Sequence, residues 1–508
     1  MYFAWLNSFT LWLLLPACAG MACHLHMRVR GFTVDDDPAL PFYSLFVVVW
    51  GVVFVRAWER ECAEHAWNWG VIFERRREQV RAHFRGELRK SPVTGSMERH
   101  CSRWEMLGAY GLSFAVTCGM LCVAFVVMVC SLNLQGYMEE HVTSLERIFY
   151  IPALARLAQP GRIFDPDQTA YFGLLTYVPG FLHSQVIAQL NRLYRHISEW
   201  LTENENHRLE EDHENSLIGK RFVFEAFDCY IALFYVGFVQ QDMRKLRSEL
   251  MQLYTMDSLR RVVCETVIPL VAKLRARRQG RERYAELKKL DRAHHAEALD
   301  QLEQAEYEQF DDFLEMVIEF GYITLFASAF PLAGVLSIFC NLIEIKSDLF
   351  KLTRVYRRPV AARAASIGTW LYVIRVLVFL SIITNVMIFA MSEQLASWAP
   401  SLYREATERD VDRGLVAHVM DEASGAHDLV MRKGRAKYVV LIATCMEHCA
   451  GFLALLLLRM IPKQPEWVSN EVARLEFYKE QQARTSRWGT AEAPASEPGS
   501  NRGSSRPS

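Results

Sequence analysis

The sequence predicts an all-α, polytopic membrane protein, and three observations lead to this prediction. Of the 508 residues, 51% are hydrophobic, which is more than a soluble protein of this size usually carries. Basic residues gather in the loops between apolar stretches. Stretches long enough to cross a bilayer as helices lie at about 3–25, 41–55, 106–133, 169–190, 222–240, 313–343, 369–391 and 438–461.

The charge balance and the motifs exclude other classes. The 57 basic and 58 acidic residues give a formal net charge of −1, so no overall field indicates a nucleic-acid partner. The chain carries no nucleophile elbow, P-loop, glycine fingerprint or HExxH motif, and these are the patterns that would indicate an enzyme. We therefore expect a membrane protein that is not an enzyme.

The first apolar stretch, YFAWLNSFTLWLLLPACAG (2–20), has two interpretations. It ends in small residues, as a signal peptide does. Signal peptides normally begin with Lys or Arg, and this stretch has neither at its start. The sequence therefore favours a first transmembrane helix.

Two basic loops predict the orientation of the chain in the membrane. RRREQVRAHFRGELRK (75–90) and the basic loop 271–293 belong on the cytoplasmic side by the positive-inside rule. Between them lie expected helices at 106–133, 169–200, 222–240 and about 246–270, an even number that agrees with this assignment. Residues 1–480 form the predicted transmembrane domain, and the Ser/Pro/Gly-rich residues 481–508 are expected to be a disordered cytoplasmic tail.

Two pairs of acids flank one apolar segment. Glu344 and Asp348 are four residues apart, and Asp312 and Glu315 are three apart, so each pair shares one face of a helix. Acids at membrane depth are costly and normally face a partner or a water-filled cavity. The four carboxylates therefore indicate a functional site.

The segment between these pairs is too short for two full crossings. Two complete helices would need about 40 residues, whereas Pro331 and Gly334 interrupt the segment near its middle. We therefore predict two short helices folded into a V. This arrangement brings both acid pairs to the same depth near the cytoplasmic side.

Clustered carboxylates need a compensating cation. Lys346 and Lys351 are near in sequence, but Lys346 lies on another helix face. A hard divalent ion such as Ca²⁺, which takes 6–8 oxygen ligands, is one candidate, and Glu265 at the end of another apolar stretch is a fifth candidate ligand. Ion pairs with basic residues of the cytoplasmic loops are the alternative, and spacing alone leaves both open.

Several motifs resemble the anoctamin family of calcium-activated ion channels and lipid scramblases, from residue 2 to about residue 480. The most specific is FGYITLFASAFPLAGVLSIFCNLIEIKSDLFKL (320–352). The others are the opening stretch at 2–20, SPVTG (91–95), LTENENHR (201–208), KRFVFEAFDCYIALFYVGF (220–238), RRPVAARAASIGTW (357–370) and the Glu447–His448 pair.

This resemblance implies about ten transmembrane helices, a homodimer, and calcium held between helices six, seven and eight. The family's ligands fall on Glu265, Asp312, Glu315, Glu344 and Asp348, the same five acids. The resemblance also implies that calcium draws the lower half of helix six toward helices seven and eight. This movement opens a groove formed by helices three to seven.

The sequence departs from the family pattern in three places. Arg261 stands one turn before Glu265, where many members carry a neutral Asn or Gln, and a guanidinium cannot ligate a cation. We therefore expect Arg261 to modulate calcium affinity, as a tethered competitor of the ion if its side chain reaches into the cavity. The acids of a secondary calcium site fall on Arg56 and Lys463, so that site is expected to be lost. The cytoplasmic domain that precedes the first helix in the family is missing, which indicates a short form or a truncated gene model.

The predicted fourth helix is unusually polar for a membrane span. Its polar residues include His183, Ser184, Gln185, Gln189, Asn191 and Arg192. Polar side chains in membranes often only bond neighbouring helices, but six on one helix favour a hydrated path. Matched to the family, the narrow gate falls near Ser184, Cys229 and Gln252.

The charges along this path bear on what it conducts. A basic residue associated with anion conduction falls on Glu225, and Asp228 follows one turn later, which disfavours an anion pore. We therefore predict a calcium-activated phospholipid scramblase with weakly selective ion conduction, in the plasma membrane or the endoplasmic reticulum. A calcium-activated channel without scrambling and a non-transporting membrane tether are the alternatives.

Overall fold

The structure is a computed structural model, and its description covers most of the chain. The residues described are 1–32, 37–72, 80–92, 95–138, 146–159, 162–164, 178–261, 263, 267–268, 270–271, 301, 304–359, 363–405, 407 and 429–489.

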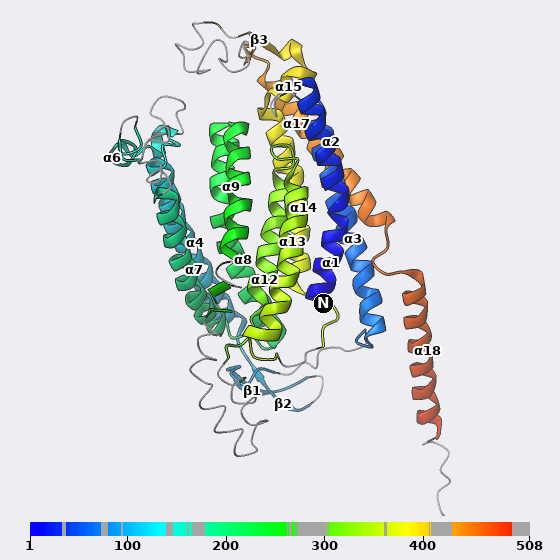
Figure 1. Ribbon diagram of the computed structural model, residues 1–508. Helices are drawn as coiled ribbons and strands as arrows, with labels where there is room; N and C mark the ends of the chain where they lie inside the picture. The colour runs from blue at the N-terminus through cyan, green and yellow to red at the C-terminus, as the bar shows by residue number, and fades with distance from the viewer. Residues whose placement is uncertain are drawn as a thin grey trace, which may run out of the picture.

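The described residues form a bundle of long helices with two short β-hairpins (Figure 1). The helices are α1 (Tyr2–Trp12), α2 (Leu14–Arg30), α3 (Leu40–Asn68), α4 (Arg103–Leu134), α5 (Glu146–Phe149), α6 (Pro152–Ala155), α7 (Val178–Asn204), α8 (Glu210–Phe234), α9 (Met243–Arg261), α12 (Gln309–Leu325), α13 (Ala333–Phe350), α14 (Thr369–Met391), α15 (Glu393–Trp398), α17 (Ala436–Met460) and α18 (Glu466–Gly489). Two π-helical turns, η2 (Tyr235–Gln240) and η4 (Lys351–Val355), continue α8 and α13. The hairpins pair β1 (Glu87–Lys90) with β2 (Met97–His100) and β3 (Tyr403–Glu405) with β4 (Leu429–Met431).

The core is built around α12. This helix is apolar on nearly all sides, as expected of a helix surrounded by others, and its residues from Phe313 onward are almost all buried. It packs on α3, α8, α13 and α14. The Phe320 ring lies near those of Phe9, Trp50 and Phe54, so aromatic contacts tie α12 to the N-terminal helices.

α1 lies inside this core, as expected for a transmembrane helix. Trp5, Leu6 and Phe9 on α1 are fully buried. The helix continues into α2 with only a local break at Leu13, which precedes Pro16. α1 therefore belongs to the packed bundle.

The predicted V is present as α12 and α13, which pack on each other. The turn between them, residues 326–332, contains Pro331 as predicted. The turn also lies against α2, where a Cβ placed on Gly20 would come 1.9 Å from the Pro331 carbonyl oxygen. Glycine is needed there because the two backbones approach closely.

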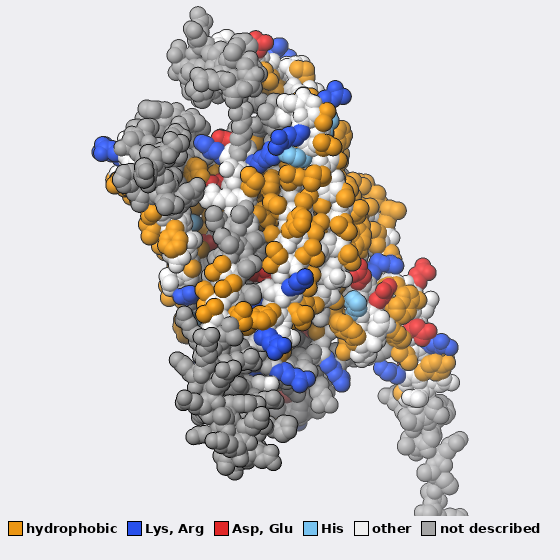
Figure 2. Space-filling model, viewed as in Figure 1, with side chains coloured by type: hydrophobic (Ala, Val, Ile, Leu, Met, Phe, Trp, Pro, Cys, Tyr) orange, Lys and Arg blue, Asp and Glu red, His pale blue; other side chains and the backbone are white. Residues whose placement is uncertain are grey.

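The exposed surface fits a membrane. Six helical segments among the described residues are long and apolar enough to span a bilayer: Tyr2–Arg30, Leu40–Asn68, Arg103–Leu134, Glu210–Gln240, Thr369–Met391 and Ala436–Met460. Figure 2 shows a broad band of hydrophobic side chains across the bundle, with Lys and Arg mainly toward its ends. The predicted fold class, an all-α integral membrane protein, is confirmed.

Ser91, Pro92 and Gly95 of the motif at residues 91–95 lie between the strands of the β1–β2 hairpin. Gly95 has a positive φ of 69°, and the Ser91 amide donates to the Ser96 carbonyl at 2.8 Å.

At the other end of the chain, α18 stands away from the bundle (Figure 1). It continues to Gly489, past the predicted start of the tail. Residues 490–508 lie outside the described residues, so the boundary at 480 stays a prediction.

Candidate metal centre

Three of the predicted acids come together where α12 meets α13. Asp312 lies in the first turn of α12, and Glu344 and Asp348 lie on the last two turns of α13. All three are buried, with exposed fractions of 5%, 3% and 0%. The V therefore brings the two acid pairs to one depth, as the sequence predicts.

A lysine holds the centre of this carboxylate cluster, which we define as Asp312, Glu344 and Asp348. Lys351 Nζ lies 2.7 Å from Asp348 Oδ1, 3.1 Å from Asp312 Oδ1 and 3.7 Å from Glu344 Oε1. Its side chain is as buried as the acids, at 4% exposure. Lys351 stands where α13 passes into η4. The alternative left open by the sequence instead pairs the acids with basic residues of the cytoplasmic loops.

Two tyrosines bind the remaining oxygens of the aspartates. Tyr2, the first residue of α1, donates its hydroxyl to Asp348 Oδ2 at 2.7 Å. Tyr307, just before α12, donates its hydroxyl to Asp312 Oδ2. Each aspartate thus pairs one oxygen with an ammonium and the other with a phenol, as buried carboxylates require.

The donor set of the cluster fits a hard cation. Carboxylate oxygens are the ligands that Ca²⁺ prefers, and the Lys351 nitrogen stands where a cation would meet all three acids. Among the described residues, no three His, Cys, Asp or Glu side chains already surround a metal position, so binding requires the ammonium to move. The residues that would hold the ion are the three clustered acids, with Glu315 one turn further along α12.

Glu315 and Glu265 are the other two predicted ligands. Glu315 is half-buried on α12. Glu265 lies outside the described residues. Arg261 is the last residue of α9, and its side chain is not among the described parts of the structure. Their roles as fifth ligand and as modulator therefore stay predictions.

The predicted gate residues lie on three helices. Ser184 and Gln185 are exposed on α7, Cys229 is half-buried on α8, and Gln252 is exposed on α9. Helix α7 packs on α4 and α8, whereas α9 packs on η2, α8 and α13. Figure 1 shows the upper part of α9 apart from α4 and α7. The assignment of a gate to these residues stays a prediction.

Acids on α8 add negative charge beside these polar residues. Glu225 is half-buried and pairs with Arg221 one turn away at 3.8 Å. Both carboxylate oxygens of Asp228 are buried without a hydrogen-bond partner in the part of the chain that the structure describes. A buried carboxylate of this kind is costly, and it attracts cations, not anions.

Arg56 occupies the place that the family gives to a secondary calcium site. Its guanidinium pairs with Glu59 on α3 and donates to the Leu458 carbonyl of α17 at 2.6 Å. Arg375 of α14 pairs with the same Glu59. A fixed positive charge therefore joins α3 to α17, and Lys463 is exposed. The loss of the secondary site stays a prediction.

The motif at 201–208 forms a buried ion cluster between α7 and α8. Glu205 is 1% exposed and contacts Lys220 Nζ at 2.7 Å, Ser216 Oγ at 2.7 Å and His207 Nε2 at 2.9 Å. Burial raises the pKa of the Glu205 carboxyl, but the hydrogen bonds outweigh burial and lower the pKa to about 2. This cluster anchors the turn that joins the two helices.

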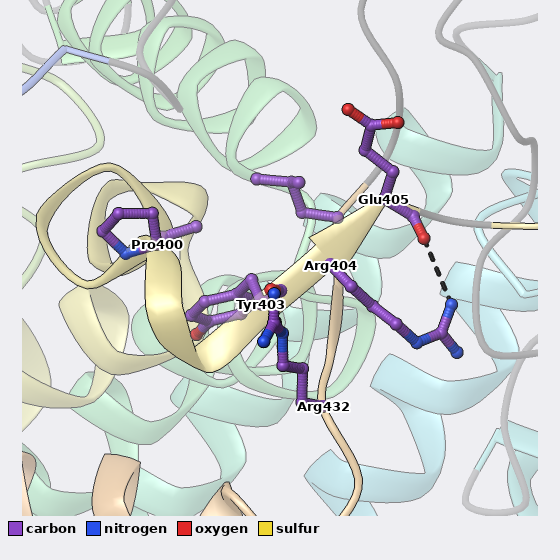
Figure 3. A pocket seen from close by; sticks show the side chains of 7 residues that line it. Pro400, Tyr403, Arg404, Glu405 and Arg432 are labelled. Carbon is purple, nitrogen blue, oxygen red and sulfur yellow. Dashed lines mark hydrogen bonds between the residues drawn. The ribbon is translucent and has the colours of Figure 1, made fainter.

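A shallow pocket of about 410 Å³ lies at the opposite end of the bundle. Figure 3 shows it beside the β3–β4 hairpin, with Pro400, Tyr403 and Arg432 among its lining residues. The Arg432 Nε donates to the Tyr403 carbonyl at 2.8 Å, and Arg404 donates to the Glu405 carbonyl at 3.1 Å. The two guanidiniums thus bond backbone carbonyls of the hairpin.

The chain matches one family along most of its length. The family model described as "Anoctamin: Calcium-activated chloride channel" matches residues 1–475. Anoctamin-10 of Mus musculus is 30% identical over 481 residues, which are 94% of this chain and 64% of that relative. Anoctamin-10 of Homo sapiens is 28% identical over 481 residues, and Anoctamin-4 of Mus musculus is 27% identical over 393 residues, which are 70% of this chain and 39% of that relative.

The chain thus spans less than two thirds of the length of these relatives. The family match agrees with the apolar spans, with the V of α12 and α13 and with the acids that it brings together. The chain belongs to the anoctamin family.

Proposed function

We propose that this chain is a calcium-activated phospholipid scramblase that also conducts ions with weak selectivity. The observation that carries the calcium part is the convergence of Asp312, Glu344 and Asp348 on one position held by an ammonium. A position that stabilises one buried cation among three acids has the charge and the oxygen donors to stabilise another. Bound there, calcium would supply two positive charges between α12 and α13.

The transport part of the proposal rests on α7. Ser184, Gln185 and Gln189 are exposed on α7, which packs on α4 and α8 at one side of the bundle (Figure 1). A lipid headgroup that crosses bare hydrocarbon loses its hydrogen bonds, at a cost of several kcal/mol for each. Exposed hydroxyl and amide groups along one helix can replace those bonds while the lipid tails stay in the bilayer.

A calcium-activated ion channel without scrambling is the second candidate. The description of the family names a chloride channel, and this observation favours conduction. The acids Glu225 and Asp228 on α8 argue for cations as the conducted species, because buried carboxylates repel anions. The two candidates share the fold and the calcium requirement and differ in what is carried.

The partners in this proposal are membrane phospholipids, calcium ions and a second copy of the chain. We propose the second copy because the resemblance to the family implies a homodimer. α17 leaves Leu441, Phe452 and Leu455 exposed, and such side chains can face either lipid or another subunit.

A vesicle assay tests the proposed function. Purified protein is reconstituted with fluorescent phospholipids in both leaflets, and an external reductant bleaches only the label that it can reach. Calcium should expose the inner-leaflet label in protein-containing vesicles and not in empty ones. Calcium-gated ion flux without lipid exchange would decide for the channel, and a lack of any calcium response would favour a non-transporting protein.

A further inference from the structure

Lys351 has the position that a bound metal ion would need. Its Nζ lies within 3.7 Å of one oxygen from each acid of the carboxylate cluster. Calcium binds carboxylate oxygens at 2.3–2.6 Å. An ion in contact with Asp312 Oδ1 and Asp348 Oδ1 would therefore overlap the ammonium, so only one of the two cations can occupy the cluster.

The ammonium also explains how the acids tolerate burial without calcium. Three carboxylates at 5% exposure or less would repel one another in a poor dielectric. Lys351 removes one unit of this charge, and the Tyr2 and Tyr307 hydroxyls bind the outer oxygens of the two aspartates. The calcium-free cluster is thus a paired network with its own cation.

For calcium to enter the cluster, the Lys351 side chain would have to move, and its place in the fold favours such a movement. It is the residue at which α13 passes into η4, so its side chain starts from the end of the helix. A lysine side chain is long and flexible and changes position by rotation about its single bonds. Release of Lys351 would restore the full negative charge of the cluster to an incoming divalent ion.

We propose that Lys351 is an intramolecular competitor of calcium, which neutralises the carboxylate cluster at rest and sets the calcium concentration at which the protein responds. The inference rests on the proposed calcium-dependent function and adds its regulation. It differs from the sequence prediction that gave such a role to Arg261, because the competing cation now comes from the same helix as two of the ligands.

The test measures calcium binding directly. Lys351→Gln, purified with calcium so that folding does not depend on the ammonium, is stripped with a chelator and titrated with calcium by calorimetry. If the ammonium fills the position for more than about 90% of the time, its removal should tighten the calcium Kd by about tenfold or more. The midpoint of thermal unfolding should fall in chelator and recover in calcium.

Two further variants separate competition from other effects. Lys351→Arg keeps a cation of larger size, so its calcium Kd should equal that of the parent protein or be weaker. Lys346→Gln removes the same charge from an exposed position on α13 and should leave the Kd unchanged. A Lys351→Arg variant that binds calcium as tightly as Lys351→Gln would show that the charge does not compete.

The outcomes for this inference and for the proposed function differ. Equal calcium affinity in the parent protein and Lys351→Gln would overturn the role of Lys351 and leave calcium activation standing. If neither protein binds calcium, while Lys351→Gln still loses stability, the cluster is a permanent ion-pair network. That result would overturn both proposals.

Discussion

At the scale of single residues, a substitution of Glu344 has the simplest expected effect on calcium binding. Its carboxylate is 3% exposed and lies 3.7 Å from Lys351 Nζ. Glu344→Gln removes one charge and keeps the shape, and a divalent ion loses twice the attraction that an ammonium loses. We expect calcium binding to weaken by on the order of 1–3 kcal/mol, measured as a shift of the calcium dose–response to higher concentration.

The matched control for this change is Glu211→Gln. Glu211 is exposed in the first turn of α8, so the same chemical change there should leave the dose–response unaltered. Both variants should unfold near the temperature of the parent protein. An unaltered dose–response in Glu344→Gln would favour permanent pairing with Lys351 over calcium binding.

The residues of the centre differ in how far sequence can predict them. The spacing of the acids on helix faces predicts that Asp312, Glu344 and Asp348 come together, and all three carboxylates do lie near Lys351 Nζ; their role as calcium ligands stays a prediction. Lys351 follows Asp348 by three residues, so the same rule of helix faces places it beside the acids and could have identified it. No local pattern identifies Tyr2, because its bond to Asp348 depends on how α1 packs against α13.

At the scale of elements, the V of α12 and α13 is predictable from length and from Pro331. The residues at which the two helices begin and end are not predictable in this way. The sequence places the apolar segment at 313–343, whereas α12 begins at Gln309 and α13 ends at Phe350. An apolar stretch of sequence ends where polar side chains begin, but the backbone hydrogen bonds of a helix continue into polar turns.

The contact between α2 and the turn of this V makes Gly20 sensitive to substitution. In Gly20→Ala the new Cβ would lie 1.9 Å from the Pro331 carbonyl oxygen, and a backbone atom cannot move aside as a flexible side chain can. We expect a loss of about 1–3 kcal/mol of stability, the usual cost of overpacking. Thermal unfolding of purified protein in detergent measures it.

Gly111→Ala on α4 is the control for Gly20→Ala. A Cβ at Gly111 would meet nothing within 4 Å, and alanine favours a helix more than glycine does. This variant should be as stable as the parent protein or slightly more so. Equal stability of the two variants would mean that α2 does not pack closely on the α12–α13 turn.

At the scale of the whole molecule, composition and hydropathy predict the all-α membrane fold. The sequence also predicts helices at 169–200 and about 246–270, where the structure has α7 and α9. Neither is among the segments that meet the apolar criterion for a span, yet both lie in the bundle (Figure 1). The relation between these helices depends on packing across the molecule, and a periodic sequence pattern does not encode it.

The last prediction concerns this pair of helices and the cargo. Ser184 on α7 and Gln252 on α9 are both exposed, and each offers a hydrogen bond to a passing headgroup. Replacing both with Leu should slow calcium-activated lipid exchange by roughly fivefold to 150-fold, because each bond lost in the crossing costs about 0.5–1.5 kcal/mol, or about 1–3 kcal/mol for the two together. The calcium Kd should not change, since neither residue belongs to the carboxylate cluster.

The control is the double change Gln464→Leu and Ser469→Leu, which alters the same kinds of side chain at exposed positions near the start of α18. It should leave both lipid exchange and calcium binding as they are. Lipid exchange that continues at the parent rate in the Ser184 and Gln252 variant would place the lipid path elsewhere on the bundle. A variant that loses lipid exchange but keeps calcium-activated ion flux would show that lipids and ions cross by separate routes, because a common route would lose both when its polar side chains are removed.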